Sequence, residues 1–158
     1  MTTQEPEEPA QIDFDSILRA SERHRRAVAA ANALNRDAVF DALTVAGIAT
    51  VLVDFDGEGD SGQLDGIVAF TGDNPVPLPA ASVRIHTAKW NTGSVVPADQ
   101  PLSDAIEILC YGYLEQEHGG WENNDGAYGA FRFDVHNRTI ELEFNGRYTD
   151  VHTETRTL

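Results

Sequence analysis

The sequence predicts an α+β fold: an N-terminal helix, or a helical hairpin, and a second helix pack on one face of a mainly antiparallel sheet of about five to six strands. Three observations lead to this class. Apolar side chains recur at helical spacing in residues 13–46 and 101–118. Apolar and polar residues alternate in two later regions, 48–70 and 128–144. Each alternating region divides into two runs joined by a short polar stretch, which is typical of hairpins buried on one face.

The N-terminal part is predicted to be helical after an acidic tail. Residues 1–12 contain two prolines and three glutamates and should be disordered. A helix over residues 13–32 is indicated by the abundance of Ala, Arg, Leu and Glu. A further segment, 37–46, would begin at an Asn35 N-cap and end at Gly47. The two segments can form one bent helix or a helical hairpin.

The middle of the chain is predicted to contain three strands. Residues 49–55 and 64–70 are β-rich runs, and the glycine-rich acidic stretch between them, 56–63, is too polar to bury. A hairpin is the natural connection between these two strands. Residues 83–90 alternate as a third strand, and residues 91–100 are expected to form a loop.

The last third is predicted to be a helix followed by a hairpin. Ser103 is the expected N-cap of the helix, whose apolar stripe stops at a pair of glycines. The hairpin would consist of residues 128–135 and 139–144. Residues 147–155 would add a last edge strand to the sheet.

The composition indicates one acidic domain, residues 13–158. The chain of 158 residues carries 26 acidic and 11 basic residues, a formal net charge of −15. Direct nucleic-acid binding is not expected, because phosphates would be repelled. The acidic balance is reversed in residues 16–36, which hold five arginines and one glutamate. The partner that this balance predicts is a protein with a basic surface.

Other broad classes are also disfavoured. The longest apolar stretches are far below the length of a membrane span, and the N-terminus is acidic rather than basic and then apolar. We therefore expect a cytoplasmic protein that does not bind membranes. The single cysteine, Cys110, excludes an internal disulfide and a cysteine-rich zinc site. The sequence does not define the oligomeric state.

Acidic residues and glycines alternate between Asp54 and Asp65. On the twelve-position calcium-loop template, acids stand at positions 1, 3, 5, 7 and 12, and glycine stands at position 6. A Ca²⁺ or Mg²⁺ site would use Asp54, Asp56, Glu58 and Asp60. The flanking residues are predicted to be strands, which argues against an EF-hand. The alternative is a solvated loop that binds no metal and uses its glycines for turns.

The same segment also permits a catalytic interpretation. A hydrophobic strand ending in Asp54-Phe55-Asp56-Gly57 resembles the first motif of haloacid-dehalogenase-type phosphatases. This resemblance implies a magnesium-dependent reaction with Asp54 as nucleophile and Asp56 as general acid. It is confined to residues 51–57 and departs at Glu58, and another strand follows where that family has β-α units. We therefore favour a protein that is not an enzyme, with no catalytic residue assigned.

A second polar stretch, residues 115–126, combines a glycine pair, a tryptophan and short polar side chains, which is typical of a recognition loop. We expect the two glycine-rich acidic loops to lie at the same end of the sheet and to line one cleft. The candidate binding residues are Asp60, Ser61, Gln63, His118, Trp121, Glu122, Asn124 and Asp125. The structural alternative is that Trp121 fills the core while residues 124–126 make a turn.

Several motifs occur in combination along the chain. They are Gly-Asp-Ser-Gly-Gln at 59–63, His-Gly-Gly-Trp-Glu-Asn-Asn-Asp-Gly-Ala at 118–127, Phe-Asp-Val at 133–135 and Ile-Glu-Leu-Glu-Phe-Asn at 140–145. Together they resemble an uncharacterised family of short acidic bacterial proteins, a domain of unknown function often found on plasmids and mobile elements. The resemblance covers residues 38–152 and brings no known activity. A mobile-element setting would suit an acidic decoy or modulator of a nucleic-acid-binding partner.

Overall fold

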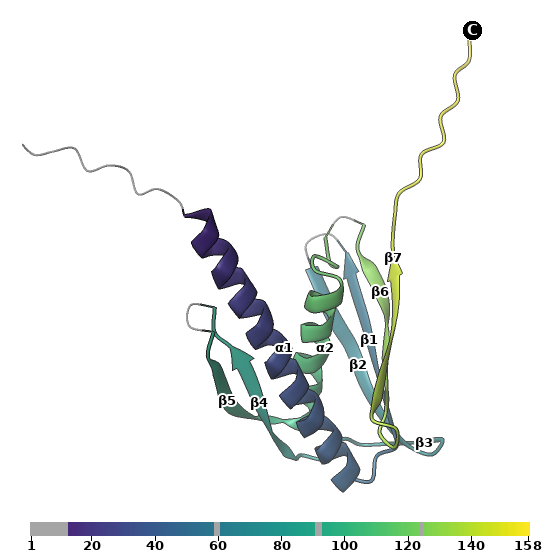
Figure 1. Ribbon diagram of the computed structural model, residues 1–158. Coiled ribbons are helices and arrows are strands. Elements are labelled where there is room, and N and C mark those ends of the chain that lie inside the picture. The colour runs from purple at the N-terminus through teal and green to yellow at the C-terminus, as the bar shows by residue number, and fades with distance from the viewer. Residues whose placement is uncertain (1–12, 59–60, 91–92, 124) are drawn as a thin grey trace, which may run out of the picture.

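Figure 1 shows a computed structural model of the chain, which describes residues 13–58, 61–90, 93–123 and 125–158. Its helices are α1 (Phe14–Val45) and α2 (Leu102–Glu117). Its strands are β1 (Thr50–Glu58), β2 (Ser61–Thr71), β3 (Asn74–Val76), β4 (Ser82–Ala88), β5 (Val95–Pro101), β6 (Ala127–Asp134) and β7 (Thr139–Gly146). The tail predicted to be disordered, residues 1–12, lies outside the described residues.

The strands form one five-stranded sheet and one two-stranded ribbon. The sheet has the order β3-β2-β1-β6-β7, and every neighbouring pair in it is antiparallel. The ribbon consists of β4 and β5. Both helices lie on one face of the sheet, and the ribbon packs on the far side of the helices (Figure 1). The predicted α+β class with a mainly antiparallel sheet is confirmed.

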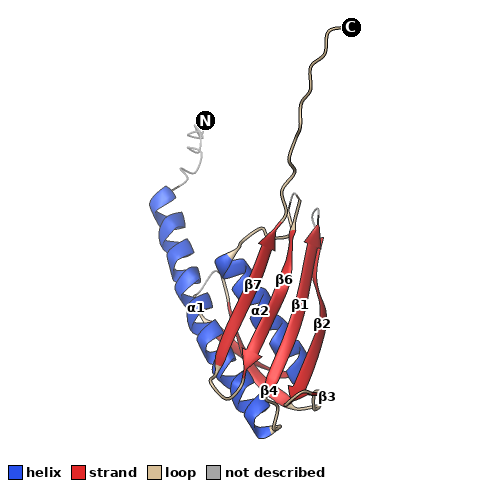
Figure 2. Cartoon of the chain, turned by 90° about the vertical axis from the view of Figure 1, so that its right-hand side faces the viewer, coloured by secondary structure: helices blue, strands red, loops and turns tan. Residues whose placement is uncertain are grey.

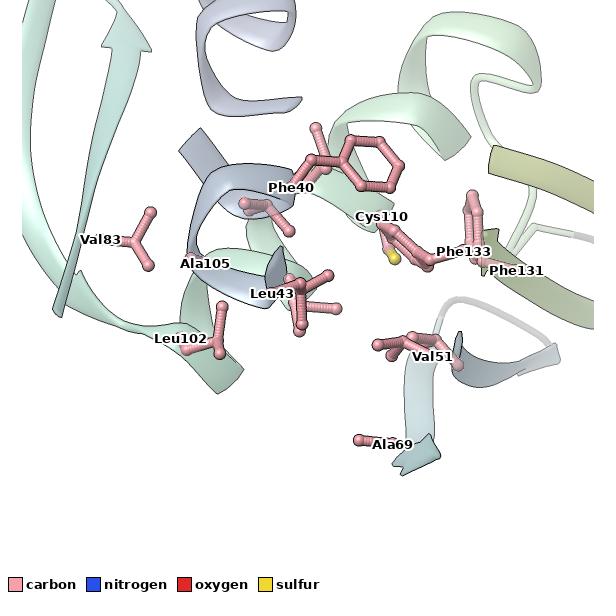
Figure 3. Close-up of a cluster of buried hydrophobic side chains, with 14 of the residues drawn as sticks. Phe40, Leu43, Val51, Ala69, Val83, Leu102, Ala105, Cys110, Phe131 and Phe133 are labelled. Carbon is pink, nitrogen blue, oxygen red and sulfur yellow. The ribbon is translucent and has the colours of Figure 1, made fainter. Parts of the chain in front are cut away.

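The core fills the space between the helices and the sheet. Phe40 of α1, Cys110 of α2 and Phe133 of β6 converge there and are fully buried (Figure 3). The rings of Phe40 and Phe133 have centroids 6.0 Å apart. Removing a side chain of this size from water stabilises a fold by about 1.5–3 kcal/mol, so burial of Phe40 contributes to holding α1 in the domain beside its contacts with β4 and α2.

The β1–β2 hairpin extends further than the sequence predicts. Residues 56–63 are expected to be a loop, but β1 continues through Glu58 and β2 begins at Ser61. Alternation explains the difference, because Asp54, Asp56 and Glu58 are exposed while Phe55 and Gly57 between them are buried. A polar composition therefore does not prevent a strand that is covered on one face only.

The N-terminal region forms one helix rather than a hairpin. Asn35, the predicted N-cap of a separate segment, is instead a buried residue inside α1. Its side-chain amide donates to the carbonyl oxygen of His86 at 3.0 Å and accepts from the His86 N–H at 2.7 Å. Asn35 therefore bonds to β4 as a neighbouring strand would. Because the Asn35 side-chain amide has these partners, it does not compete for the backbone hydrogen bonds of α1, and the helix continues through this residue.

Both ends of α1 have recognisable caps. At the N-terminus the Asp13 carboxylate accepts from the Ser16 hydroxyl at 2.6 Å and from the Asp15 N–H at 3.1 Å. These hydrogen bonds, chiefly that of the Ser16 side chain, lower the pKa of Asp13. At the C-terminus Gly47 has a φ of 72°, so the predicted left-handed glycine after the helix is confirmed.

The ribbon contains a strand where the sequence predicts a loop. Residues 91–100 were expected to be irregular, yet β5 occupies most of this region and pairs with β4 from Ser82 to Ala88. Pro97 in its middle disfavours a central strand. It is compatible here because β5 has a partner strand on one side only. The position of the missing proline N–H can therefore face the unpaired side, where no ladder hydrogen bond is lost.

The start of α2 also differs from the prediction. Ser103 was expected to cap this helix, but Pro101 is the N-cap and no side chain bonds to the first turn. The N–H of the fully buried Leu102 donates to the carbonyl oxygen of Ala81 at 2.8 Å. The chain therefore passes from β5 into the helix without a polar cap, because a tertiary contact satisfies the first N–H.

The predicted last edge strand is absent from the fold. Residues 147–158 have no regular secondary structure, and β7 is the edge of the sheet. The prediction for residues 147–155 was therefore wrong for the isolated chain, since no strand among the described residues lies beside them.

We predict that Asn35→Ala destabilises the domain by about 1–3 kcal/mol, because it leaves the N–H and C=O of His86 without partners at a half-buried site. The measurement is chemical denaturation. Asn137→Ala is the control, since Asn137 is exposed and bonds to Asp134 within a turn, and its loss should cost less than about 0.5 kcal/mol. Equal losses in the two variants would contradict this role of Asn35.

Candidate functional site

Trp121 connects the two predicted loops at one end of the sheet. The inward faces of Gly57 and Gly62 lie against its indole, and a Cβ on these glycines would be 2.6 and 2.5 Å from ring carbons. The indole also meets the Phe55 ring edge-on at 5.4 Å. Trp121 is only 6% exposed. The two loops therefore lie at the same end of the sheet, and the indole fills the space between them, as in the structural alternative.

The other described residues of the second loop have separate contacts. The His118 ring stacks on Phe144 of β7, with centroids 3.6 Å apart and an interplanar angle of 7°. Asp125 accepts a hydrogen bond from the Thr149 hydroxyl at 2.8 Å. Glu122 lies against the β1–β2 hairpin, and its Oε2 is buried without a hydrogen-bond partner. These three residues thus contact different parts of the chain.

The candidate residues of the first loop divide between two faces. Gln63 is exposed on the face opposite Trp121, and its amide donates to the Asp65 carboxylate at 3.1 Å. The Ser61 backbone pairs with Glu58 at the start of β2. Asp60 and Asn124 lie outside the described residues. The structure thus brings Trp121 and Glu122 to the hairpin and leaves Gln63 on the other face, and the role of all these residues in binding stays a prediction.

The described carboxylates of the predicted metal site form a row. Asp54, Asp56 and Glu58 are successive exposed positions of β1, and two residues of a strand span about 6.6 Å. A calcium ion takes its oxygen ligands at about 2.3–2.6 Å from several directions, whereas these three side chains leave the strand in a straight row, and the Asp56 carboxylate is bound to Arg147 at 2.9 Å. Among the described residues, no group of three or more His, Cys, Asp or Glu side chains is placed to hold a metal. Asp60, the fourth predicted ligand, lies outside them.

The row belongs to a larger acidic surface. In the part of the chain that the structure describes, no helix covers the side of the five-stranded sheet that faces the viewer in Figure 2. We call this side the open face. Its exposed positions on β1, β2 and β7 carry the carboxylates of Asp54, Asp56, Glu58, Asp65, Glu141 and Glu143.

Two arginines partly balance this surface. Arg132 of β6 lies between Leu52 and Glu141 in the register of the sheet. Arg147 binds the Asp56 carboxylate at 2.9 Å and the Gly57 carbonyl oxygen at 3.1 Å. Its guanidinium also lies 4.7 Å from the centre of the Tyr128 ring. The remaining carboxylates face solvent, so the open face is acidic.

The other end of the open face carries apolar side chains among polar ones, including Asp73 and Arg132. Leu52 and Phe70 line a shallow hollow of about 270 Å³ together with Thr50 and Arg132. Val68, which pairs with Leu52 in the register of β1 and β2, is 43% exposed. The open face thus combines a small apolar area with a row of carboxylates along the same strands.

No local sequence pattern groups the carboxylates of the open face. Glu141 and Glu143 were recognised only as the polar positions of a half-buried strand, and Asp54 and Asp56 only as loop ligands. The signal was present in the alternation of both hairpins. The acidic positions of the two hairpins form one surface only when β1 and β6 pair, because this pairing joins the hairpins into one sheet.

The arginine-rich segment forms the exposed first half of α1. Arg19, Arg23 and Arg26 line a hollow of about 430 Å³ together with Glu22. None of the ion pairs between described residues involves these arginines. Among the described helices, none is long and apolar enough to cross a membrane.

The fold and the site define an acidic α+β domain with one uncovered sheet face. Residues 31–158 match the model of DUF6878, a family of unknown function, and the chain belongs to this family. The resemblance to an uncharacterised family is confirmed at that level. Comparison with curated proteins and with solved structures finds no match.

We predict that Gly62→Ala destabilises the domain by about 1–3 kcal/mol, because the new methyl group would overlap the indole of Trp121. Chemical denaturation measures this loss, and tryptophan fluorescence should report the displaced ring. Gly66→Ala is the matched control in the same strand, since no atom lies within 4 Å of its Cβ position. A Gly62→Ala variant as stable as Gly66→Ala would contradict the packing of Trp121.

The two interpretations of Asp54–Asp60 predict different calorimetric results. If the carboxylates keep the spacing of a strand, titration with Ca²⁺ or Mg²⁺ should give no saturable heat. A metal site would instead give saturable binding, and a hundredfold excess over Kd would stabilise the fold by about 2.7 kcal/mol. An Asp56→Asn/Asp60→Asn variant should then lose both effects. We expect the first result, and saturable heat that this variant abolishes would establish the second.

Proposed function

We propose that this protein is a non-enzymatic, cytoplasmic interaction protein whose open face binds the basic surface of a protein partner. The observation that carries the proposal is the open face itself: six exposed carboxylates and two arginines lie on the side of the sheet that no described helix covers. Opposite charges across an interface steer association and select the partner.

The arrangement of the carboxylates supports a decoy or modulator of a nucleic-acid-binding partner. On β1 they recur about every 6.6 Å in a straight row, so their negative charge is arranged in a line, as the charge of a phosphate backbone is. A groove lined with lysine and arginine for a phosphate backbone could therefore receive this row. In the mobile-element setting that the resemblance implies, such binding would protect foreign nucleic acid from a host protein.

The apolar side chains of the open face support an interface of moderate size. Protein interfaces bury an apolar centre and surround it with polar groups. Leu52, Val68 and Phe70 can supply part of such a centre. Charge alone would give weak, salt-sensitive binding, whereas burial of these side chains would add contacts that salt does not screen.

A fluorescent oligoarginine peptide is a suitable probe for the charge complementarity of the open face. Asp54→Asn/Asp56→Asn/Glu58→Gln should weaken peptide binding about tenfold, because it removes three adjacent exposed carboxylates. Fluorescence anisotropy at two salt concentrations measures the effect. The wild-type protein should also displace duplex DNA from the peptide.

The control must change the net charge equally at another place. Asp99→Asn/Glu107→Gln/Glu115→Gln removes three carboxylates from β5 and α2 and should weaken binding less than twofold. Equal losses in the two triple variants would show that the peptide reports only the net charge. That result would remove the open face as the binding surface.

A further inference from the structure

The C-terminal segment, residues 148–158, continues from β7 as an exposed chain (Figures 1 and 2). Tyr148 is 85% exposed and Val151 is 77% exposed. The segment nevertheless lies within the part of the chain that matches the family model. It is also the segment for which the sequence predicts a strand that the isolated chain does not form.

The amino-acid sequence of this segment is typical of a β-strand. A β-branched residue stands at every second position, namely Thr149, Val151, Thr153, Thr155 and Thr157. β-Branched residues favour strands, and an alternation of this kind separates two faces. The intervening positions are Tyr148, Asp150, His152, Glu154, Arg156 and Leu158.

Contacts along the chain show that the second set of side chains shares one face. The Glu154 carboxylate lies 4.0 Å from His152 Nε2 and 3.5 Å from an Arg156 guanidinium nitrogen. Side chains two residues apart meet in this way when the backbone is extended. The segment is therefore already close to a strand conformation and lacks only a partner strand.

We propose that this segment pairs in antiparallel fashion with the same segment of a second copy of the chain, with Thr153 opposite Thr153. In an antiparallel pair, directly opposite residues lie on the same face of the ladder. The β-branched face then places Thr149 opposite Thr157 and Val151 opposite Thr155. Threonine and β-branched pairs of this kind stabilise cross-strand contact.

The register follows from the charges on the other face. With Thr153 at the two-fold axis, Asp150 lies opposite Arg156 and His152 lies opposite Glu154. Tyr148 then lies opposite Leu158, so an aromatic ring meets an apolar side chain. Because the axis makes every pair occur twice, the dimer contains two Asp150–Arg156 pairs.

The neighbouring registers are disfavoured by the same charges. A shift that places His152 at the axis puts Asp150 opposite Glu154. A shift in the other direction puts Glu154 opposite Glu154. Like charges directly opposite each other destabilise a strand pair, so the charges favour Thr153 at the axis over these two shifts.

The expected association is weak. A two-stranded ribbon without further strands is only marginally stable, so dimers should form at high protein concentration. The segments project away from the domains, which allows two acidic domains to stay apart while their C-terminal strands pair. Mutual repulsion of the domains thus opposes the pairing less than it would oppose a face-to-face dimer.

Cysteine cross-linking of the full chain tests the register. Thr153→Cys should form a disulfide-linked dimer on mild oxidation, because opposite residues in an antiparallel pair are about 4.5–5.5 Å apart between Cα atoms. Val151→Cys and Thr155→Cys should cross-link with each other when mixed, and much less when oxidised alone. The native Cys110 is fully buried, and burial raises the pKa of its thiol, so it should not compete.

Charge exchange tests the same pairing without cysteine. Asp150→Arg and Arg156→Asp should each weaken dimerisation about tenfold, since each replaces two opposite-charge pairs by like-charge pairs. The double variant restores opposite charges and should dimerise like the wild type. Sedimentation velocity over a range of concentrations measures these effects. A wild-type chain that stays monomeric, or a double variant that dimerises no better than the single variants, would overturn the proposal.

Discussion

The alternation of side chains along β1 is the constraint on which both sides of the molecule depend. β1 is the middle strand of the five-stranded sheet and is hydrogen-bonded to β2 and β6, so successive residues must point to opposite faces. Val53 and Phe55 therefore enter the core, and Asp54 and Asp56 enter the open face. A shift of the register by one residue would bury the carboxylates, which is why the acidic surface and the core specify the same pairing.

The fold could be predicted where local patterns decide the structure. The hairpin of residues 128–144 has a clear alternation of apolar and polar residues, and Gly47 after α1 is a local stop signal, so both were correct. Predictions failed where a tertiary contact replaced a local signal. Asn35 has the sequence signature of a cap, yet it bonds to β4, which is 51 residues away in the chain. Pro97 disfavours strands in general but not in a ribbon that pairs on one side.

The candidate site was less predictable than the fold because it is a property of paired strands. The acids of β1 occupy alternate positions, and alternate acids are equally compatible with a metal-binding loop and with the exposed side of a strand. The choice depends on whether β1 pairs on both sides, which no local pattern reveals. The position of Trp121 against Gly57 and Gly62 was also hidden, since glycines in a polar stretch usually indicate turns and here provide space for a ring.

The length of α1 has a mechanical consequence for the residues that precede the family match. The helix has 32 residues and is about 48 Å long, and its first buried residue is Ala27. One turn earlier, His24 still packs edge-on against Trp90, with ring centroids 4.7 Å apart. Residues 14–23 therefore form a rigid spacer of about 15 Å whose direction is set by packing elsewhere in the helix (Figure 1). Each inserted residue would rotate that spacer by about 100° about the helix axis. The direction in which Arg19 and Arg23 point therefore depends on which positions of α1 form the buried stripe that holds the helix in the domain.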